Sequence, residues 1–157
     1  MMFIGIDPGQ SGGMAILHEG GLEIPSIYPF LKMTERDIHV QLNDARESYP
    51  DDQIFAMLEK VGAFPGQGVS STWKFGQHYG FLRGILTAQG IPFELVRPQV
   101  WQTAMGCLTK GDKNVSKAAA QRLFPSIKMT HAIADAVLIA EYCRRTVNSR
   151  TAKAVLA

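Results

Sequence analysis

Two acidic residues stand where apolar segments of the chain end. Asp7 closes the segment MFIGID just before Pro8-Gly9, and Glu59 ends the apolar part of QIFAMLEK. Burying a charge at the end of an apolar strand is costly unless the charge has a partner. A divalent cation such as Mg²⁺ prefers oxygen ligands and satisfies several carboxylates at once. Asp7 and Glu59 are therefore candidate metal ligands, although, taken alone, Asp7 also fits a turn and Glu59 an exposed strand end.

A second pair of candidate ligands lies near the C-terminus, in the segment THAIADAVLIAEYCRR. The apolar pattern predicts a helix from His131 to Thr146. A spacing of four residues places His131 and Asp135 only about 40° apart around the helix axis, so both side chains project from one face. The alternative is a simple helix start, in which Thr130 caps the helix and His131 is a cap-region residue. Glu141 falls on another face and is a weak candidate.

The remaining pattern predicts one α/β domain that positions these residues. The expected strands are MFIGID, MAILH, GLEIPSIY, QIFAMLEK and IPFELVRP, with the first two in a hairpin and the third at a sheet edge because of its proline. The expected helices run from a capping box at Thr34 to about Ser48, from Thr72 to Gln89 behind a cap at Ser70 or Ser71, from Pro98, over SKAAAQRLF, and from His131. The helix between the fourth and fifth strands has the length of a parallel crossover, which gives a mixed five-stranded sheet flanked by helices. Both strand-end acids then lie at carboxyl ends of strands, where sites in such sheets occur.

Length, composition and charge describe a soluble protein of one domain. We expect residues 1–147 of the 157 to form this domain and residues 148–157 to be a loosely held tail. No apolar run reaches the roughly 18–20 residues of a membrane span, and MMFIGIDPGQ lacks the basic region of a secretory signal. Cys107 and Cys143 are expected as free thiols in a reducing cytoplasm. The net charge of +2 permits nucleic-acid binding, since basic residues concentrate between Lys110 and Arg150.

Three stretches of the chain resemble a known family. FIGIDPGQSGGMAIL, MLEKVGAFPGQGVSSTWKFGQHYGFLRGIL and HAIADAVLIAEYCRR are similar to the first strand, the second acidic strand with its helix, and the C-terminal helix of RuvC-type Holliday junction resolvases, in the ribonuclease H-like superfamily. FELVRPQVWQ fits that family's fifth strand. EKVGAFPGQGVSS and ADAVLIAEY look most like the shorter RuvC-like nucleases of bacteriophages. The resemblance covers the chain from about Phe3 to Arg145.

The resemblance implies a ribonuclease H-like fold and a homodimer. It also implies an endodeoxyribonuclease that acts in DNA recombination and repair by placing paired, symmetric nicks in four-way (Holliday) junctions, with two Mg²⁺ or Mn²⁺ ions per active site. A phage-encoded enzyme of this kind would work in the cytoplasm of its host.

Matched by position, Asp7, Glu59 and Asp135 correspond to the family's first, second and last metal-binding acids. The family's remaining acid falls here on His131 or Ala132, which is a departure, although some family members use histidine at that place. Asp7 is expected to bridge the two ions, and His131 to ligate an ion or to donate a hydrogen bond to the scissile phosphate.

Basic side chains near the ions would contact DNA phosphates. Lys110, Lys113 and Lys117 lie in and after the polar segment KGDKN, and the last two are four residues apart, on one face of a helix. The alternative for these lysines is a solvated helix face. Lys74, in the long helix after Glu59, is a further candidate DNA contact.

An aromatic side chain in the loop after Glu59 would be able to stack on a base at the open centre of a junction. Phe64 lies in the Gly-Pro-rich part of this loop and is the expected wedge. Trp73 and Phe75 follow in the helix. Packing within the protein is the favoured expectation for both, and a wedge role is the alternative.

Two other functions remain open, and a third is excluded by the length of the chain. The first is a nuclease of the same fold with broader specificity for branched or flapped DNA. The second is a non-catalytic junction-binding protein in which His131 marks a decayed metal site, although the presence of all three acids argues against it. An ATP-binding actin-like or sugar-kinase fold shares the strand-Asp-Gly opening, but 157 residues are too few for its two domains.

Overall fold

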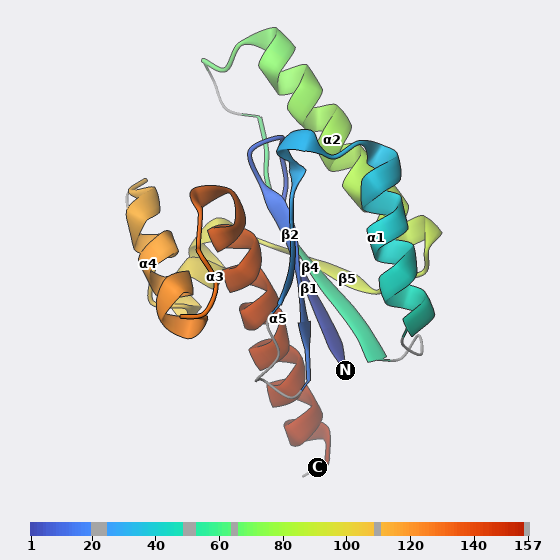
Figure 1. Ribbon diagram of the computed structural model, residues 1–157, viewed down its shortest axis with the longest axis vertical. Helices are drawn as coiled ribbons and strands as arrows, with labels where there is room; N and C mark the ends of the chain where they lie inside the picture. The colour runs from blue at the N-terminus through green and yellow to red at the C-terminus, as the bar shows by residue number, and fades with distance from the viewer. Residues whose placement is uncertain (20–24, 49–52, 64–65, 109–110, 156–157) are drawn as a thin grey trace.

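A mixed sheet runs through the middle of the protein, with helices on both faces (Figure 1). The computed structural model describes residues 1–19, 25–48, 53–63, 66–108 and 111–155. Within these residues the sheet has five strands in the order β3-β2-β1-β4-β5: β1 (Met2–Asp7), β2 (Gly13–His18), β3 (Ser26–Pro29), β4 (Ile54–Glu59) and β5 (Phe93–Val96). β1 pairs antiparallel with β2 and parallel with β4, while β5 pairs parallel with β4. The predicted hairpin, edge strand and parallel crossover are confirmed.

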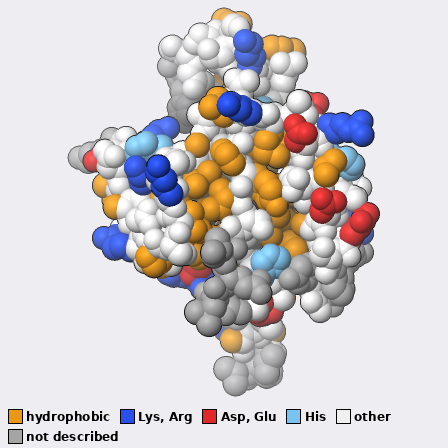
Figure 2. All heavy atoms as spheres, in the orientation of Figure 1, with side chains coloured by type: hydrophobic (Ala, Val, Ile, Leu, Met, Phe, Trp, Pro, Cys, Tyr) orange, Lys and Arg blue, Asp and Glu red, His pale blue; other side chains and the backbone are white. Residues whose placement is uncertain are grey.

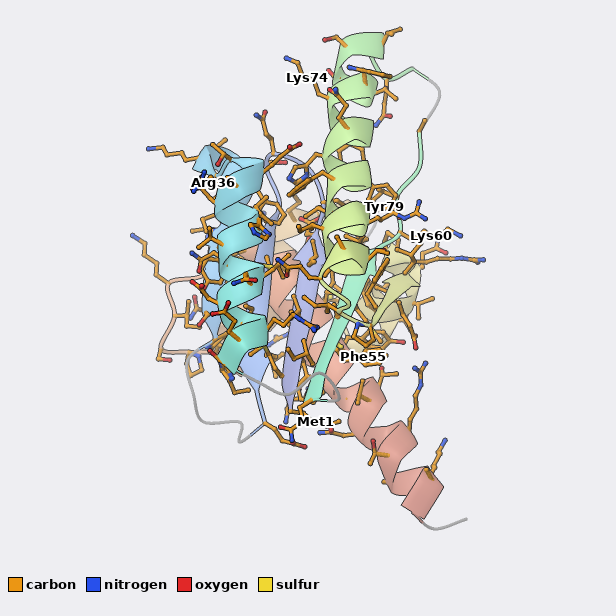
Figure 3. The ribbon with its side chains drawn as sticks, turned by 90° about the vertical axis from the view of Figure 1, so that its right-hand side faces the viewer. Met1, Arg36, Phe55, Lys60, Lys74 and Tyr79 are labelled. Atoms are coloured by element: carbon orange, nitrogen blue, oxygen red, sulfur yellow. The ribbon has the colours of Figure 1, made fainter. Side chains whose placement is uncertain are left out.

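The helices form two layers, one on each face of the sheet (Figures 1 and 3). One layer holds α5 (His131–Val155), which packs on β1, β2 and β4 and is covered by α3 (Pro98–Ala104) and α4 (Lys113–Leu123). The other layer holds α1 (Glu35–Ser48) and α2 (Val69–Ala88), preceded by the short 3-10 helix η1 (Phe30–Lys32). The described part of the chain thus has the predicted α/β class. None of its helices has the length and apolar content needed to cross a membrane.

β1 is covered on both faces, which explains why it is apolar at almost every position. Phe3 belongs to the core under α5, whereas Ile4 and Ile6 belong to the core under α1 and α2. Gly5 faces α5 so closely that an added Cβ would lie 2.1 Å from the backbone nitrogen of Ala140. Only a glycine permits this approach of helix to strand.

The starts of α1, α3 and α5 agree with the sequence, whereas those of α2 and α4 differ. Thr34 and Asp37 form the predicted capping box, since the Asp37 amide donates to Thr34 Oγ1 at 3.2 Å and the Thr34 amide donates to Asp37 Oδ2 at 2.7 Å. α2 begins at Val69, so the expected serine cap at position 70 or 71 is wrong: Gly68 occupies the N-cap position without a side-chain hydrogen bond. α4 begins at Lys113, inside the segment expected to be a polar break, because the Asp112 side chain accepts from the Asn114 amide at 2.9 Å.

The last helix is longer than expected. α5 continues past Thr146 to Val155, so the expected helix end at Thr146 is wrong. Val147 is buried, and Arg150 forms an ion pair with Glu94 of β5 that ties the extension to the sheet. The helix crosses the expected boundary between residues 147 and 148 without a break, and the division into a domain and a tail stays a prediction.

Candidate metal centre

Asp7 and Glu59 lie side by side at one end of the sheet. β1 and β4 are parallel, with Ile6 opposite Leu58, so the acids that end the two strands are neighbours at their carboxyl ends. The loop after Asp7 is tight: Gly12 donates its amide to the Gly9 carbonyl at 3.1 Å, and a Cβ at Gly12 would lie 2.2 Å from the Asp7 carbonyl oxygen. The backbone around Asp7 is therefore held closely in place.

The Asp7 carboxyl is strongly perturbed by its surroundings. Burial raises its pKa well above the usual range, and the charges of Glu59 and Asp135 raise it further, while Lys113 acts in the opposite direction. Asp135 reaches this position because α5 docks closely on β1. The contact is between Gly5 of β1 and Ala140, which lies about one turn after Asp135 on α5. The three acids that the sequence predicted as metal ligands therefore act on one another in the folded protein.

Glu59 has a direct hydrogen-bond partner that the sequence did not reveal. The indole nitrogen of Trp101, on α3, donates to Glu59 Oε2 at 2.7 Å. Burial raises the pKa of Glu59 to about 7, the bond from Trp101 opposes this, and the charge of Asp135 adds to it. At neutral pH, and without a cation, Glu59 is thus close to half protonated.

Asp135 is the carboxylate with an unused oxygen. Burial raises its pKa, and a hydrogen bond from the Ser116 hydroxyl and the charges of Lys113 and His131 oppose the rise. Its Oδ1 atom is buried and has no hydrogen-bond partner. A buried acceptor without a partner is costly, so this oxygen is suited to receive a ligand.

A divalent cation fits the chemistry of this site. Three partly buried carboxylates with raised pKa values repel one another, and a hard cation would relieve that repulsion and supply a partner for Asp135 Oδ1. Among the described residues, however, no three His, Cys, Asp or Glu side chains already lie close enough together to hold an ion.

The other predicted site residues fall into two groups. His131, at the exposed start of α5, and Lys113, at the start of α4, lie near enough to Asp135 for their charges to act on it. Lys117 is half-buried on α4, and Lys74 is exposed and projects from the N-terminal part of α2 (Figure 3). Phe64 and Lys110 lie outside the described residues. The weak candidate Glu141 is buried and bonded to two arginines of its own helix, away from the three acids.

Charge is unevenly distributed over the face seen in Figure 2. Acidic side chains gather over α1, while lysine and arginine side chains lie over α4 on the opposite side of the view.

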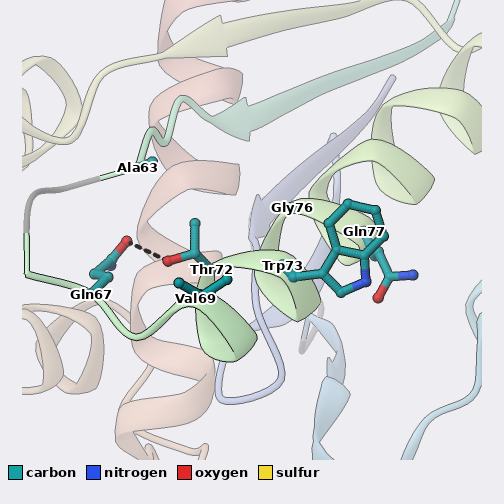
Figure 4. A pocket seen from close by; sticks show the side chains of 7 residues that line it. All are labelled: Ala63, Gln67, Val69, Thr72, Trp73, Gly76 and Gln77. Atoms are coloured by element: carbon teal, nitrogen blue, oxygen red, sulfur yellow. Dashed lines mark hydrogen bonds between the residues drawn. The ribbon is translucent and has the colours of Figure 1, made fainter.

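A hollow lies along the start of α2 (Figure 4). It has a volume of about 640 Å³ and is lined by residues of the loop before α2 and of its first turns: Ala63, Gln67, Val69, Thr72, Trp73, Gly76 and Gln77. Trp73 is 68% exposed, so the expectation that it packs within the protein is wrong. Phe75 does pack, because its ring would be 2.9 Å from a Cβ at Gly9.

Comparison with known proteins places this geometry in a known architecture. No protein-family model and no curated protein sequence matches the chain significantly. Solved structures do match, among them Thermus thermophilus RuvC in complex with a Holliday junction substrate (TM-score 0.61, 16% identity, 89% of this chain and 90% of that one) and T. thermophilus RuvC (TM-score 0.58, 18% identity, 89% and 91%). The chain has a RuvC-like fold. Its mixed sheet and helices are therefore of the ribonuclease H-like kind that the sequence predicted.

Sequence reasoning missed Trp101 and Ser116, the two donors that hold Glu59 and Asp135. In the sequence, Trp101 is simply one residue of the short helix that follows the fifth strand. Ser116 is a small polar residue shortly before a run of alanines. Nothing in their spacing indicates a partner, because each bond forms only when α3 and α4 pack beside the strand ends and α5.

Proposed function

We propose that this protein is a structure-specific endodeoxyribonuclease that depends on divalent metal ions and resolves four-way DNA junctions by paired, symmetric nicks. The observation that carries the proposal is the convergence of Asp7, Glu59 and Asp135 at the carboxyl ends of β1 and β4 in a RuvC-like fold. One of the similar structures, T. thermophilus RuvC, is bound to a Holliday junction substrate.

Asp7, Glu59 and Asp135 would hold two Mg²⁺ or Mn²⁺ ions. Such ions lower the pKa of water and neutralise charge on a phosphodiester as it is hydrolysed. Because the pKa of Glu59 is raised to about 7, this carboxyl would release a proton when a cation binds near neutral pH. Cleavage should therefore weaken as the pH falls below 7.

Lys113 would guide the DNA backbone to this position. It is exposed at the first residue of α4 and lies close enough to Asp7 and Asp135 to lower the pKa of both. A phosphate that approaches the carboxylates would meet this ammonium group, and Lys117 one turn later on α4 would contact the next part of the backbone. Lys74 on α2 remains a proposed DNA contact, as do Lys110 and Phe64, which lie outside the described residues.

A homodimer suits the reaction, because two symmetric cuts need two active sites related by a two-fold axis. The surface of α2 supports a protein contact: Val69 is 87% exposed, Trp73 is 68% exposed, and an added Cβ at Gly76 or Gly80 would meet nothing within 4 Å. Exposed apolar patches of this kind mark interaction sites in soluble proteins.

The proposal is tested with purified protein and synthetic DNA. A four-way junction, a flap and a linear duplex of matched length are incubated in Mg²⁺ and in Mn²⁺, with the Asp7→Asn variant as a control. We expect symmetric nicks confined to the junction, and none from the variant. Cleavage of flaps alone would favour the broader branched-DNA nuclease, and junction binding without cleavage in either metal would favour a non-catalytic binding protein.

A further inference from the structure

Trp101 is the largest fully buried side chain among the described residues, and its indole carries an N–H donor. Its ring is 0% exposed and belongs to the core between the sheet, α4 and α5. A buried indole usually needs an acceptor for its N–H, and here the acceptor is Glu59 Oε2 at 2.7 Å. The core packing of one residue thus fixes the carboxylate of another at the candidate metal centre.

The position of the indole is itself well determined. β5 pairs with β4 next to Glu59, with Val96 opposite Glu59, and the Lys60 amide donates to the Val96 carbonyl at 2.7 Å. α3 then begins at Pro98, which presets the backbone for the first helical turn. Trp101 follows within that turn. β5, which pairs with β4 at Glu59, therefore leads directly into α3, and Trp101 of α3 holds the Glu59 side chain.

Asp135 is held in a similar way. The Ser116 hydroxyl of α4 hydrogen-bonds to its carboxylate, and Asp135 Oδ1 is left buried without a partner. Glu59 and Asp135 each have one neutral donor, from α3 and α4 respectively, and each keeps acceptor capacity for another ligand. A neutral donor orients a carboxylate without adding positive charge that would repel a dication.

We infer that Trp101 is a positioning residue, which orients Glu59 through its indole N–H so that the carboxylate is ready to bind a divalent cation. The inference deepens the proposed function and rests on it. Donors that orient metal-binding side chains typically change metal affinity roughly 10–100-fold when they are removed. We therefore expect the loss of this single N–H to weaken cation binding by that factor, with little loss of cleavage once the cation is saturating.

The test removes the N–H and keeps the shape of the side chain. Trp73 is the only other tryptophan, so the Trp73→Phe protein carries a single tryptophan at position 101. Producing this protein with β-(3-benzothienyl)alanine in place of tryptophan substitutes a sulfur for the indole nitrogen at that one position. Mn²⁺ binding to the DNA-free protein is measured by titration, alongside the Mn²⁺ dependence of junction cleavage. Trp101→Phe is a second variant, and circular dichroism and thermal unfolding check that each protein folds.

The outcomes separate the inference from the function on which it rests. Weaker Mn²⁺ binding in the benzothienyl protein than in the Trp73→Phe protein, with cleavage restored at high Mn²⁺, supports the inference. Equal Mn²⁺ affinity in the two folded proteins overturns it. Adding Asp7→Asn to the Trp73→Phe protein locates the ion: if this change leaves Mn²⁺ binding intact, the proposed metal centre itself is wrong. If Mn²⁺ binding depends on both Asp7 and the indole N–H but no DNA is cut, the positioning role stands and the nuclease proposal fails.

Discussion

α5 and α2 are the two longest helices of the described chain, and they meet the sheet in different ways. α5 lies directly on β1 at Gly5 and buries nearly every side chain along its middle: Ala134, Ala136, Val137, Leu138, Ile139, Ala140 and Glu141. α2 buries only Leu82 and Leu86, both in its second half, and exposes Val69 and Trp73 in its first turns. The two helices lie on opposite faces of the same sheet (Figure 1).

The two helices differ in this way because they serve different tasks: one holds a side chain in place, and the other presents an open surface. A carboxylate that binds a metal ion must be held in place, and α5 provides this for Asp135 through close contact with β1. A surface that meets another macromolecule must instead stay open, and the first half of α2 leaves apolar side chains uncovered. The same chain therefore uses one helix to fix the candidate site and another to present a surface.

The largest expected contrast comes from two glycine substitutions. In Gly5→Ala the new Cβ would meet Ala140 and Ala136 backbone atoms at 2.1 and 2.3 Å, so α5 must move off β1. We expect a loss of about 3 kcal/mol or more in the free energy of unfolding. In Gly80→Ala the new methyl group meets nothing, and the better helix propensity of alanine should add about 1 kcal/mol. Urea unfolding measures both, and similar effects of the two changes would contradict the comparison.

The next contrast is between pH values. The pKa of Glu59 is raised in the folded protein from 4.5 to about 7, and those of Asp7 and Asp135 are raised too. Because an acid with a raised folded-state pKa must ionise against its surroundings, stability is lost as the pH rises from the unfolded value through the folded one. For Glu59 alone this is on the order of 3 kcal/mol.

The contribution of these acids should therefore make the metal-free protein less stable above pH 7 than below pH 4.5. Mg²⁺ should recover the stability that is lost at high pH. Urea unfolding in EDTA and in Mg²⁺ across this range measures it, and Glu59→Gln should show a shallower dependence. A pH dependence that is the same in the variant would show that Glu59 does not cause it.

A smaller effect is expected from the basic side of α4. Lys113→Ala and Lys117→Ala should each weaken junction binding and reduce the slope of log affinity against log salt by about 0.9 for each phosphate contact that is lost. Lys153→Ala, near the far end of α5, serves as the matched control. Filter binding or fluorescence anisotropy over a range of salt concentrations measures the slope. Identical slopes for all three variants would leave the α4 lysines as a solvated helix face.

The smallest expected effect concerns His131. An imidazole nitrogen suits Mn²⁺ better than Mg²⁺, so the wild-type protein should cut faster in Mn²⁺ at matched concentration. His131→Ala should lose that preference, whereas His39→Ala on α1 should keep it. Equal or faster cleavage in Mg²⁺ by the wild-type protein would argue against direct ligation by His131.

Much of the site could be predicted because it depends on local patterns. Asp7 and Glu59 each end an apolar strand, and a crossover of the right length makes those strands parallel, so their acids meet at one edge. His131 and Asp135 share a helix face by simple spacing. These inferences need only strand ends, helix periodicity and the direction of the strands.

The parts that could not be predicted depend on contacts between distant segments. The bond from Trp101 to Glu59 joins residues 42 positions apart and exists only because α3 lands beside β4. The extension of α5 to Val155 runs through a polar segment, which Val147 and the ion pair of Arg150 with Glu94 hold against the sheet. The exposure of Trp73 likewise follows from how α2 sits on the sheet, since its aromatic character alone favoured a buried position.

The central claim is that Asp7, Glu59 and Asp135 form one metal-dependent nuclease site. Its most direct test is to map the nicks made in a labelled four-way junction by the wild-type protein and by Asp7→Asn, Glu59→Gln and Asp135→Asn, with junction affinity measured in parallel. We predict paired, symmetric nicks from the wild-type protein in Mg²⁺ or Mn²⁺, and cleavage at background level from each variant despite retained binding. Wild-type nicking by any one of the three variants would contradict the account.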